Sequence, residues 1–122
     1  MKTFLFIALL VAAFATAAQA QTVQVDINRA TLLWTWTQDP IGGNADEFRV
    51  KCGNVSGTYN RTTAVGPTLR EVAIKSAIGG PGNWFCVVAA ANAFGESGVS
   101  NEVPFAAGAA PVGNLGLQVR AQ

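Results

Sequence analysis

The sequence contains no histidine and has little charge, little sulfur and a single phenolic side chain. Charged residues make up 12% of the 122-residue chain, which has two cysteines, one methionine and one tyrosine. Histidine is the commonest general base near neutral pH and the commonest protein ligand of transition metals. Its absence excludes histidine-based catalysis and histidine metal sites.

The carboxylates offer little chemistry in its place. Asp46 and Glu47 are adjacent just before an expected strand, where successive side chains point to opposite faces. We interpret them as a solvated loop end rather than a catalytic pair. Together with Asp39 and Asn44 they provide oxygen ligands for a weak Ca²⁺ site, but loop carboxylates are more often simply hydrated. We therefore expect no catalytic residue, no metal and no cofactor.

The chain also lacks any block of like charge. Eight basic residues face seven acidic ones, and one of the eight, Lys2, lies in the N-terminal segment that we expect to be removed. Binding to nucleic acid or to anionic lipid requires a basic patch. We expect neither as a partner of the mature chain.

The long apolar run of the sequence lies at its N-terminus. Residues 4–14 are continuously apolar, follow Lys2, and precede the small-x-small pattern Ala18-Gln19-Ala20. This pattern predicts a secretory signal peptide over residues 1–20, with cleavage before Gln21. The run is too short for a membrane anchor, which needs about 20 apolar residues. The expected location is secreted or periplasmic.

Two cysteines in an oxidising compartment indicate one disulfide, between Cys52 and Cys86. The alternative is a pair of buried free thiols that pack as small apolar side chains. Asn54 and Asn60 begin N-glycosylation sequons on expected surface loops, and whether they are used depends on the source.

The remaining residues read as short strands separated by turns. Alternation in "EFRVKC" points Phe48, Val50 and Cys52 inward, and "WFCVVAAA" is expected to be a central strand rather than a helix. Pro104 argues for an edge or irregular position of the last strand. The expected strands are 23–27, 30–37, 47–52, 58–66, 70–78, 84–91 and 100–106.

The stretch "WFCVVAAANAFGESGVSNEVPF" resembles the last two strands of a fibronectin type III domain. Trp84 stands where that family usually has a tyrosine, Val88 follows inward, and Asn92 and Gly95 mark a reversal where a positive φ is expected. "LLWTWTQDP" resembles the strand that carries the core tryptophan, and we favour Trp36 over Trp34. A tryptophan at position 84 has no hydroxyl for a tyrosine corner, so the local hydrogen bond must differ.

The resemblance covers about residues 23–106 and implies an all-β, immunoglobulin-like sandwich of about seven strands. It places the two cysteines on neighbouring strands, which implies a bridge within one sheet. We expect one domain over 21–106 and a tail over 107–122. The core residues expected are Trp34, Trp36, Phe48, Val50, Trp84 and Val88.

The tail begins with an Ala/Gly/Pro-rich linker and then alternates apolar Leu115, Leu117 and Val119 with Gly116, Gln118 and Arg120. That alternation is typical of a half-buried strand. Three outcomes stay open, namely folding back, addition to a neighbouring sheet edge, or a frayed end.

Three functions are compatible with these observations. The first is a non-catalytic module that binds an unknown protein or glycan partner through loops or an edge strand. The second is an assembling subunit of an extracellular fibre, a phage or a virion, which forms homo-oligomers through the tail strand. The third is a carbohydrate-binding accessory module, for which Tyr59 is the main aromatic residue outside the expected core.

Overall fold

The structure is a computed structural model that describes residues 22–121. The predicted signal peptide lies outside the described residues. Within 22–121, no helix has the length and apolar character needed to cross a membrane.

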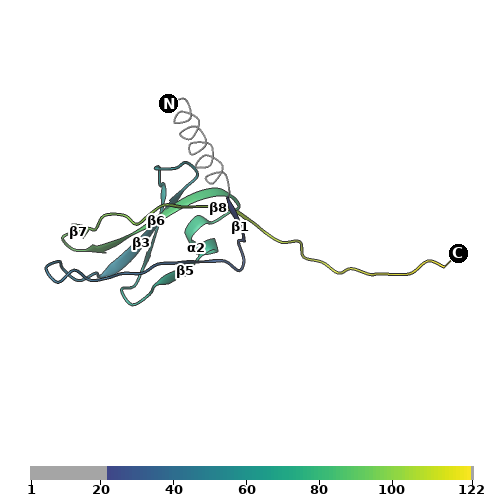
Figure 1. The fold of residues 1–122 in the computed structure, drawn as a ribbon, viewed down its shortest axis with the longest axis horizontal. Coiled ribbons are helices and arrows are strands. Elements are labelled where there is room, and N and C mark those ends of the chain that lie inside the picture. Colours follow the sequence, from purple (N-terminus) through teal and green to yellow (C-terminus); the bar gives the residue numbers. More distant parts are fainter. Residues whose placement is uncertain (1–21, 122) are drawn as a thin grey trace, which may run out of the picture.

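The larger of two sheets has six strands (Figure 1). Its strands are antiparallel except that the first and last strands of the chain pair in parallel. The order across this sheet is β1 (Val23–Asp26), β8 (Val103–Gly108), β6 (Gly82–Asn92), β3 (Glu47–Gly53) and β4 (Arg61–Val65), with the two-residue β7 (Gly95–Glu96) also on β6.

A second layer covers one face of this sheet. It consists of β2 (Thr31–Leu33) paired with β5 (Glu71–Ala73), followed by the short helix α2 (Ile74–Ile78). The helix buries Ile74, Ala77 and Ile78 in the same apolar cluster as the inward residues of β3 and β6. The described chain is therefore a two-layered, mostly β sandwich, as the sequence predicts.

Alternating residues of β3 build the centre of the core. Phe48, Val50 and Cys52 are each at most 2% exposed, while the residues between them are half-buried. The central strand β6 is buried on both faces for most of its length, which agrees with its continuous apolar sequence.

Several predicted strands are shorter than expected, and the one expected over 58–66 spans only β4. The segment 30–37 is a strand only over β2, because the antiparallel partner β5 offers three residues. Thr31 faces Ala73, where β5 gives way to α2, and Leu33 faces Glu71, where β5 begins. The prediction of a strand over 70–78 is wrong beyond Ala73. Ile74, Ala77 and Ile78 have the i, i+3, i+4 spacing of a buried helix face, and Gly79 ends the helix with φ of +76°.

The last strand also differs from the prediction. It spans Val103–Gly108 rather than 100–106, and it is not an edge strand, because β1 and β6 flank it. Pro104 is tolerated because β1 begins to pair with β8 only at Phe105, so the missing N–H falls just outside that ladder.

Candidate interaction site

The expected core residues fall into two groups. Phe48, Val50 and Trp84 are buried, whereas Trp34, Trp36 and Val88 are half-buried. Both tryptophan rings lie against Phe48, with centroids 5.8 Å from its ring. Trp34 also packs against the main core cluster, while Trp36 packs edge-on against Phe48.

Side-chain hydrogen bonds explain two residues beside the chain reversals, Trp84 and Asn92. The indole N–H of Trp84 donates to the carbonyl of Gly80 at 3.1 Å. Gly95 has a φ of +144°, but Asn92 does not have a positive φ. Asn92 instead holds its turn with its side chain, which accepts from the Phe94 N–H at 2.8 Å and donates to the Asn44 carbonyl at 3.0 Å.

The structure contains the predicted disulfide between Cys52 and Cys86. The two residues are direct partners in the β3–β6 register, so the bridge joins neighbouring strands of one sheet. It is fully inside the core, where Cys52 is 0% and Cys86 is 3% exposed.

The acidic residues of the 38–47 region do not converge. Asp39 accepts the Ile41 N–H at 3.0 Å within its own turn, and Glu47 pairs with Arg49 at 2.5 Å. Across residues 22–121 no three or more Cys, Asp or Glu side chains lie together in a way that could hold a metal ion.

Glu102 forms a cluster that the sequence analysis missed. Its carboxylate accepts hydrogen bonds from Ser56 Oγ at 2.6 Å, the Gly57 N–H at 2.9 Å and Tyr59 Oη at 2.6 Å. These donors hold the pKa of Glu102 below the ordinary carboxyl value. The hydrogen bond that Tyr59 donates to Glu102 raises the pKa of the Tyr59 hydroxyl. The cluster connects the β3–β4 turn to the chain just before β8. It could not be predicted from the sequence, because the contacts span 43 to 46 positions and no local pattern signals them.

The outer face of the main sheet carries a second network. Glu96 on β7 accepts from Arg49 at 2.7 Å and from Lys51 at 2.5 Å, both on β3. The hydrogen bonds from Lys51 and Arg49 lower the pKa of Glu96. The hydrogen bonds that Arg49 donates to Glu47 and Glu96 raise the pKa of Arg49. Between these strands lie Ala89 and Ala91, each 2% exposed although they face outward. The long charged side chains therefore cover the small residues of β6.

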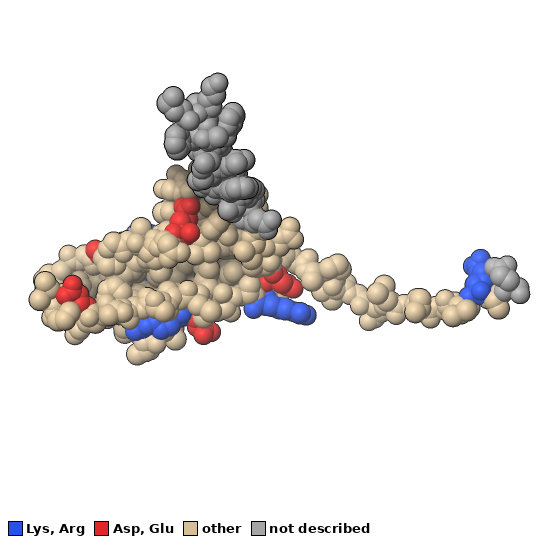
Figure 2. Space-filling model, viewed as in Figure 1, with Lys and Arg blue, Asp and Glu red and all other residues tan. Residues whose placement is uncertain are grey.

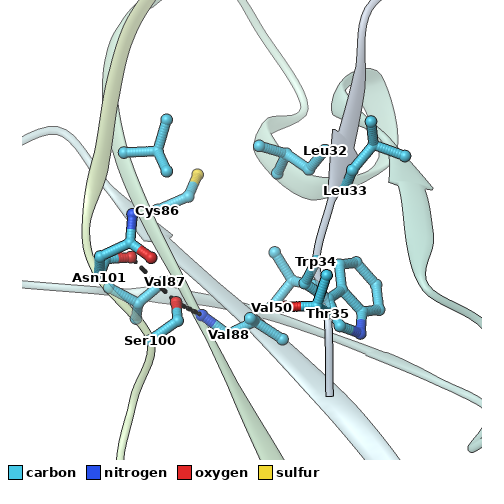
Figure 3. Close-up of a pocket in the computed structure, with 11 residues that line it drawn as sticks. Leu32, Leu33, Trp34, Thr35, Val50, Cys86, Val87, Val88, Ser100 and Asn101 are labelled. Carbon is cyan, nitrogen blue, oxygen red and sulfur yellow. Dashed lines mark hydrogen bonds between the residues drawn. The ribbon is translucent and has the colours of Figure 1, made fainter. Parts of the chain in front are cut away.

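An apolar groove of about 450 Å³ opens along one side of the sandwich. One wall is β2 with the two residues that follow it, and the other is the segment 100–103 beside β6 (Figure 3). Core residues of the main sheet form part of the lining. The lining consists of Leu32, Leu33, Trp34, Thr35, Val50, Cys86, Val87, Val88, Ser100, Asn101 and Val103.

The wall opposite β2 is not a regular strand. Ser100 bonds to Val88 twice, donating its N–H to the Val88 carbonyl and accepting the Val88 N–H with its hydroxyl, both at 2.9 Å. Ser97 makes the same pair of bonds to Ala90, each near 2.8–2.9 Å. The two serines therefore bond the backbone N–H and carbonyl groups of Val88 and Ala90 on β6, in the gap between β7 and β8 where strand pairing is interrupted.

The edge of β2 that faces away from β5 is unpaired within the described chain. The backbone N–H of Trp34 donates to the Arg70 carbonyl, and the backbone carbonyl of Ala30 accepts from the Ile74 N–H, so both groups point toward β5. Backbone groups alternate in direction along an antiparallel strand. Those of Thr31, Leu33 and Thr35 therefore point away from β5, toward the open side.

The C-terminal tail runs away from the sandwich in an extended course after β8 (Figure 1). Leu115, Leu117 and Val119 are 103%, 97% and 94% exposed. The tail therefore does not fold back on its own domain in this structure. Figure 2 shows that it carries no charged side chain before the Arg120 region and that charges are scattered over the visible face of the sandwich.

Within residues 22–121, the aromatic side chain left exposed is not the one expected. Phe94, at the tip between β6 and β7, is 98% exposed, and Ile41 on the neighbouring loop is 94% exposed. Tyr59 is half-buried and its hydroxyl is engaged by Glu102.

Searches against protein-family profiles, curated proteins and solved structures found no match for this chain.

Proposed function

We propose that this protein is an exported, non-catalytic sandwich module of the fibronectin type III kind that acts by binding another protein through its C-terminal strand. The observation that carries the proposal is the alternation of Leu115, Leu117 and Val119, each more than 90% exposed on an extended backbone. Such a segment leaves both its apolar side chains and its backbone groups without partners, which favours pairing with a sheet edge of another chain.

The compact part of the molecule supports this role as a scaffold. A disulfide within the sandwich suits an oxidising compartment, and the segment 1–20 has the pattern of an export signal. Electrospray mass spectrometry of the exported protein is expected to give a chain that starts at Gln21 and is two hydrogens lighter than its reduced form. A mass that retains Met1 would contradict export by this signal.

A second candidate, an assembling subunit of an extracellular fibre, a phage or a virion, is favoured by the direction of the tail, which projects away from its own sandwich. A carbohydrate-binding role has less support. Such sites need aromatic rings exposed together on one face, whereas Phe94 is exposed alone and the hydroxyl of Tyr59 is occupied.

The test of the interaction role is photo-crosslinking from the tail. A photoreactive amino acid replaces Leu117 in the full chain, and the matched control places it at Val112, which is equally exposed but precedes the alternating segment. Ultraviolet irradiation in the producing cells is expected to give a discrete protein adduct from position 117 and much less from position 112. No adduct from position 117 would overturn the proposed interaction role.

A further inference from the structure

We propose that the groove beside β2 receives the tail strand of a second copy of this chain, so that copies join head to tail. This inference rests on the proposed function and names both the partner and its binding surface. The groove offers an unpaired strand edge over an apolar floor that includes Val50, Cys86 and Val88. The tail offers an unpaired strand with an apolar face.

The two surfaces match in length and chemistry. Thr31–Thr35 is five residues long and presents outward backbone groups at alternate positions, as derived above from the β2–β5 bonds. Leu115–Val119 is also five residues long, which spans about 17 Å as a strand. Its three apolar side chains lie on one face, so they enter the groove together while its backbone pairs with β2.

The geometry of the chain favours a second copy over the chain's own tail. The tail leaves at the Gly108 end of β8, whereas the groove lies beside the other end, at Ser100 and Val103. The linker of six residues, 109–114, reaches about 20 Å when fully stretched, which is about the length of β8. It would have to reverse direction at once and run past β1, which already occupies that edge of β8.

A contact between a tail and a groove on different surfaces is heterologous. Repetition of such a contact gives an open chain of subunits, or a ring where the rotation closes. Each added tail strand would pair with the free edge of β2 and cover the groove. Assembly would therefore also fill the open edge of the smaller sheet.

The test uses two full-length variants that are each defective in one surface. Leu117→Asp places a charge on the apolar face of the tail strand, so this variant is defective in the tail. Leu33→Pro removes an N–H that points away from β5, so it blocks strand addition while leaving the β2–β5 bonds in place. Val103→Lys, at a groove residue that is 41% exposed, is a second groove-defective variant, used if the proline disturbs folding. Ile41→Asp and Val112→Asp are controls at exposed apolar positions outside both surfaces.

Size-exclusion chromatography with light scattering is expected to show oligomers that grow with concentration for the unchanged protein and both controls. Each defective variant alone is expected to be monomeric. An equimolar mixture of the tail-defective and groove-defective proteins is expected to give a complex with the mass of one copy of each, because one intact tail can enter one intact groove. Two monomers in that mixture, or a monomeric unchanged protein, would overturn the inference.

A peptide of residues 111–122 provides an independent readout that needs no assembly. Its binding to Leu117→Asp protein is expected to change the fluorescence of Trp34 in the groove, and a peptide carrying the same Leu→Asp change is expected to be inert. If the tail instead crosslinks in cells to a different protein while these mixtures stay monomeric, the interaction role stands and the self-assembly inference fails.

Discussion

Gly53 shows how one residue can fix a turn by its lack of a side chain. It ends β3, and a Cβ placed there would lie 1.9 Å from the carbonyl oxygen of Thr58 across the following turn. The chain returns so tightly because Val55 and Thr58 form an isolated bridge. This turn is also the one that Ser56, Gly57 and Tyr59 tie to Glu102.

Gly53→Ala is therefore expected to lower the free energy of unfolding by about 1–3 kcal/mol, the cost typical of forcing atoms into a packed site. The control is Gly66→Ala, where nothing lies within 4 Å of the added carbon, and it is expected to change stability by less than about 1 kcal/mol. Urea denaturation followed by tryptophan fluorescence measures both. Equal effects of the two substitutions would contradict this reading of Gly53.

The residues that sequence reasoning found and missed differ in kind. Inward positions such as Phe48 and Val50 follow from alternation along one strand, because burial of one face imposes a period of two. Glu102 was missed because its three donors lie 43 to 46 positions away, and the sequence has no local signal for such a contact. Alternation cannot separate Trp34 from Trp36, because both have the same parity and both rings contact Phe48.

At the scale of elements, the clearest miss is α2. Its five residues are too few for a detectable helical period, yet three apolar side chains at i, i+3 and i+4 followed by glycine mark a buried turn of helix. The strands β3 and β6 were predictable because long ladders keep one register over seven paired residues. The short strands β2 and β5 depend on tertiary contacts, so their ends could not be read from propensity.

The disulfide ties β3 to β6, the pair with the longest register in the larger sheet. Replacing both cysteines with alanine is expected to lower stability by up to about 4 kcal/mol, since the bridge closes a loop with a sequence separation of 34. The fold is expected to persist because Phe48, Val50 and Trp84 keep their contacts. Thermal denaturation followed by circular dichroism measures the loss, and a variant with unchanged melting temperature would contradict the expectation.

The Glu96 network connects β7 to β3 and makes stability depend on pH. Because the folded pKa of Glu96 lies below the ordinary carboxyl value of 4.5, ionised Glu96 stabilises the fold above that value. The stabilisation is lost as the pH falls through the lower, folded pKa. Glu96→Gln is expected to be less stable than the unchanged protein at pH 7 and to lose less stability on acidification.

The control for this experiment is Glu71→Gln, since Glu71 is exposed on β5 and forms no ion pair within residues 22–121. Melting temperatures between pH 3 and pH 7 are compared at low salt, where the ion pairs are least screened. If the two variants show the same acid dependence, the network contributes nothing measurable.

At the scale of the whole molecule, the two-layer β arrangement was predictable because regularly spaced short strands with turn residues between them have few ways to bury one face. The course of the tail was not. Its alternation predicts a strand but not a partner, because the same pattern serves folding back or addition to another chain. In the structure the fold ends at Gly108, and 109–121 has no regular structure and no burial.

Because the fold ends at Gly108, the tail is expected to be removable without unfolding the sandwich. Elastase cleaves after small residues but not before proline, so of the exposed Ala109 and Ala110, which precede Pro111, only Ala109 is a cleavage site, whereas Ala89, Ala90 and Ala91 are buried in β6. Brief digestion of dilute protein is expected to release the tail and leave a core that ends at Ala109 or a few residues beyond Pro111, identified by mass spectrometry. The melting temperature of that core is expected to stay within about 4 °C of the dilute intact protein.

The same digestion at high protein concentration separates a free tail from a docked one. A tail strand held in the groove of another copy is expected to restrain the linker that precedes it and to slow release severalfold, and Leu117→Asp is expected to remove that protection. Rapid loss of the core itself at any concentration would instead mean that residues beyond Gly108 support the sandwich, and the boundary drawn at the end of β8 would be wrong.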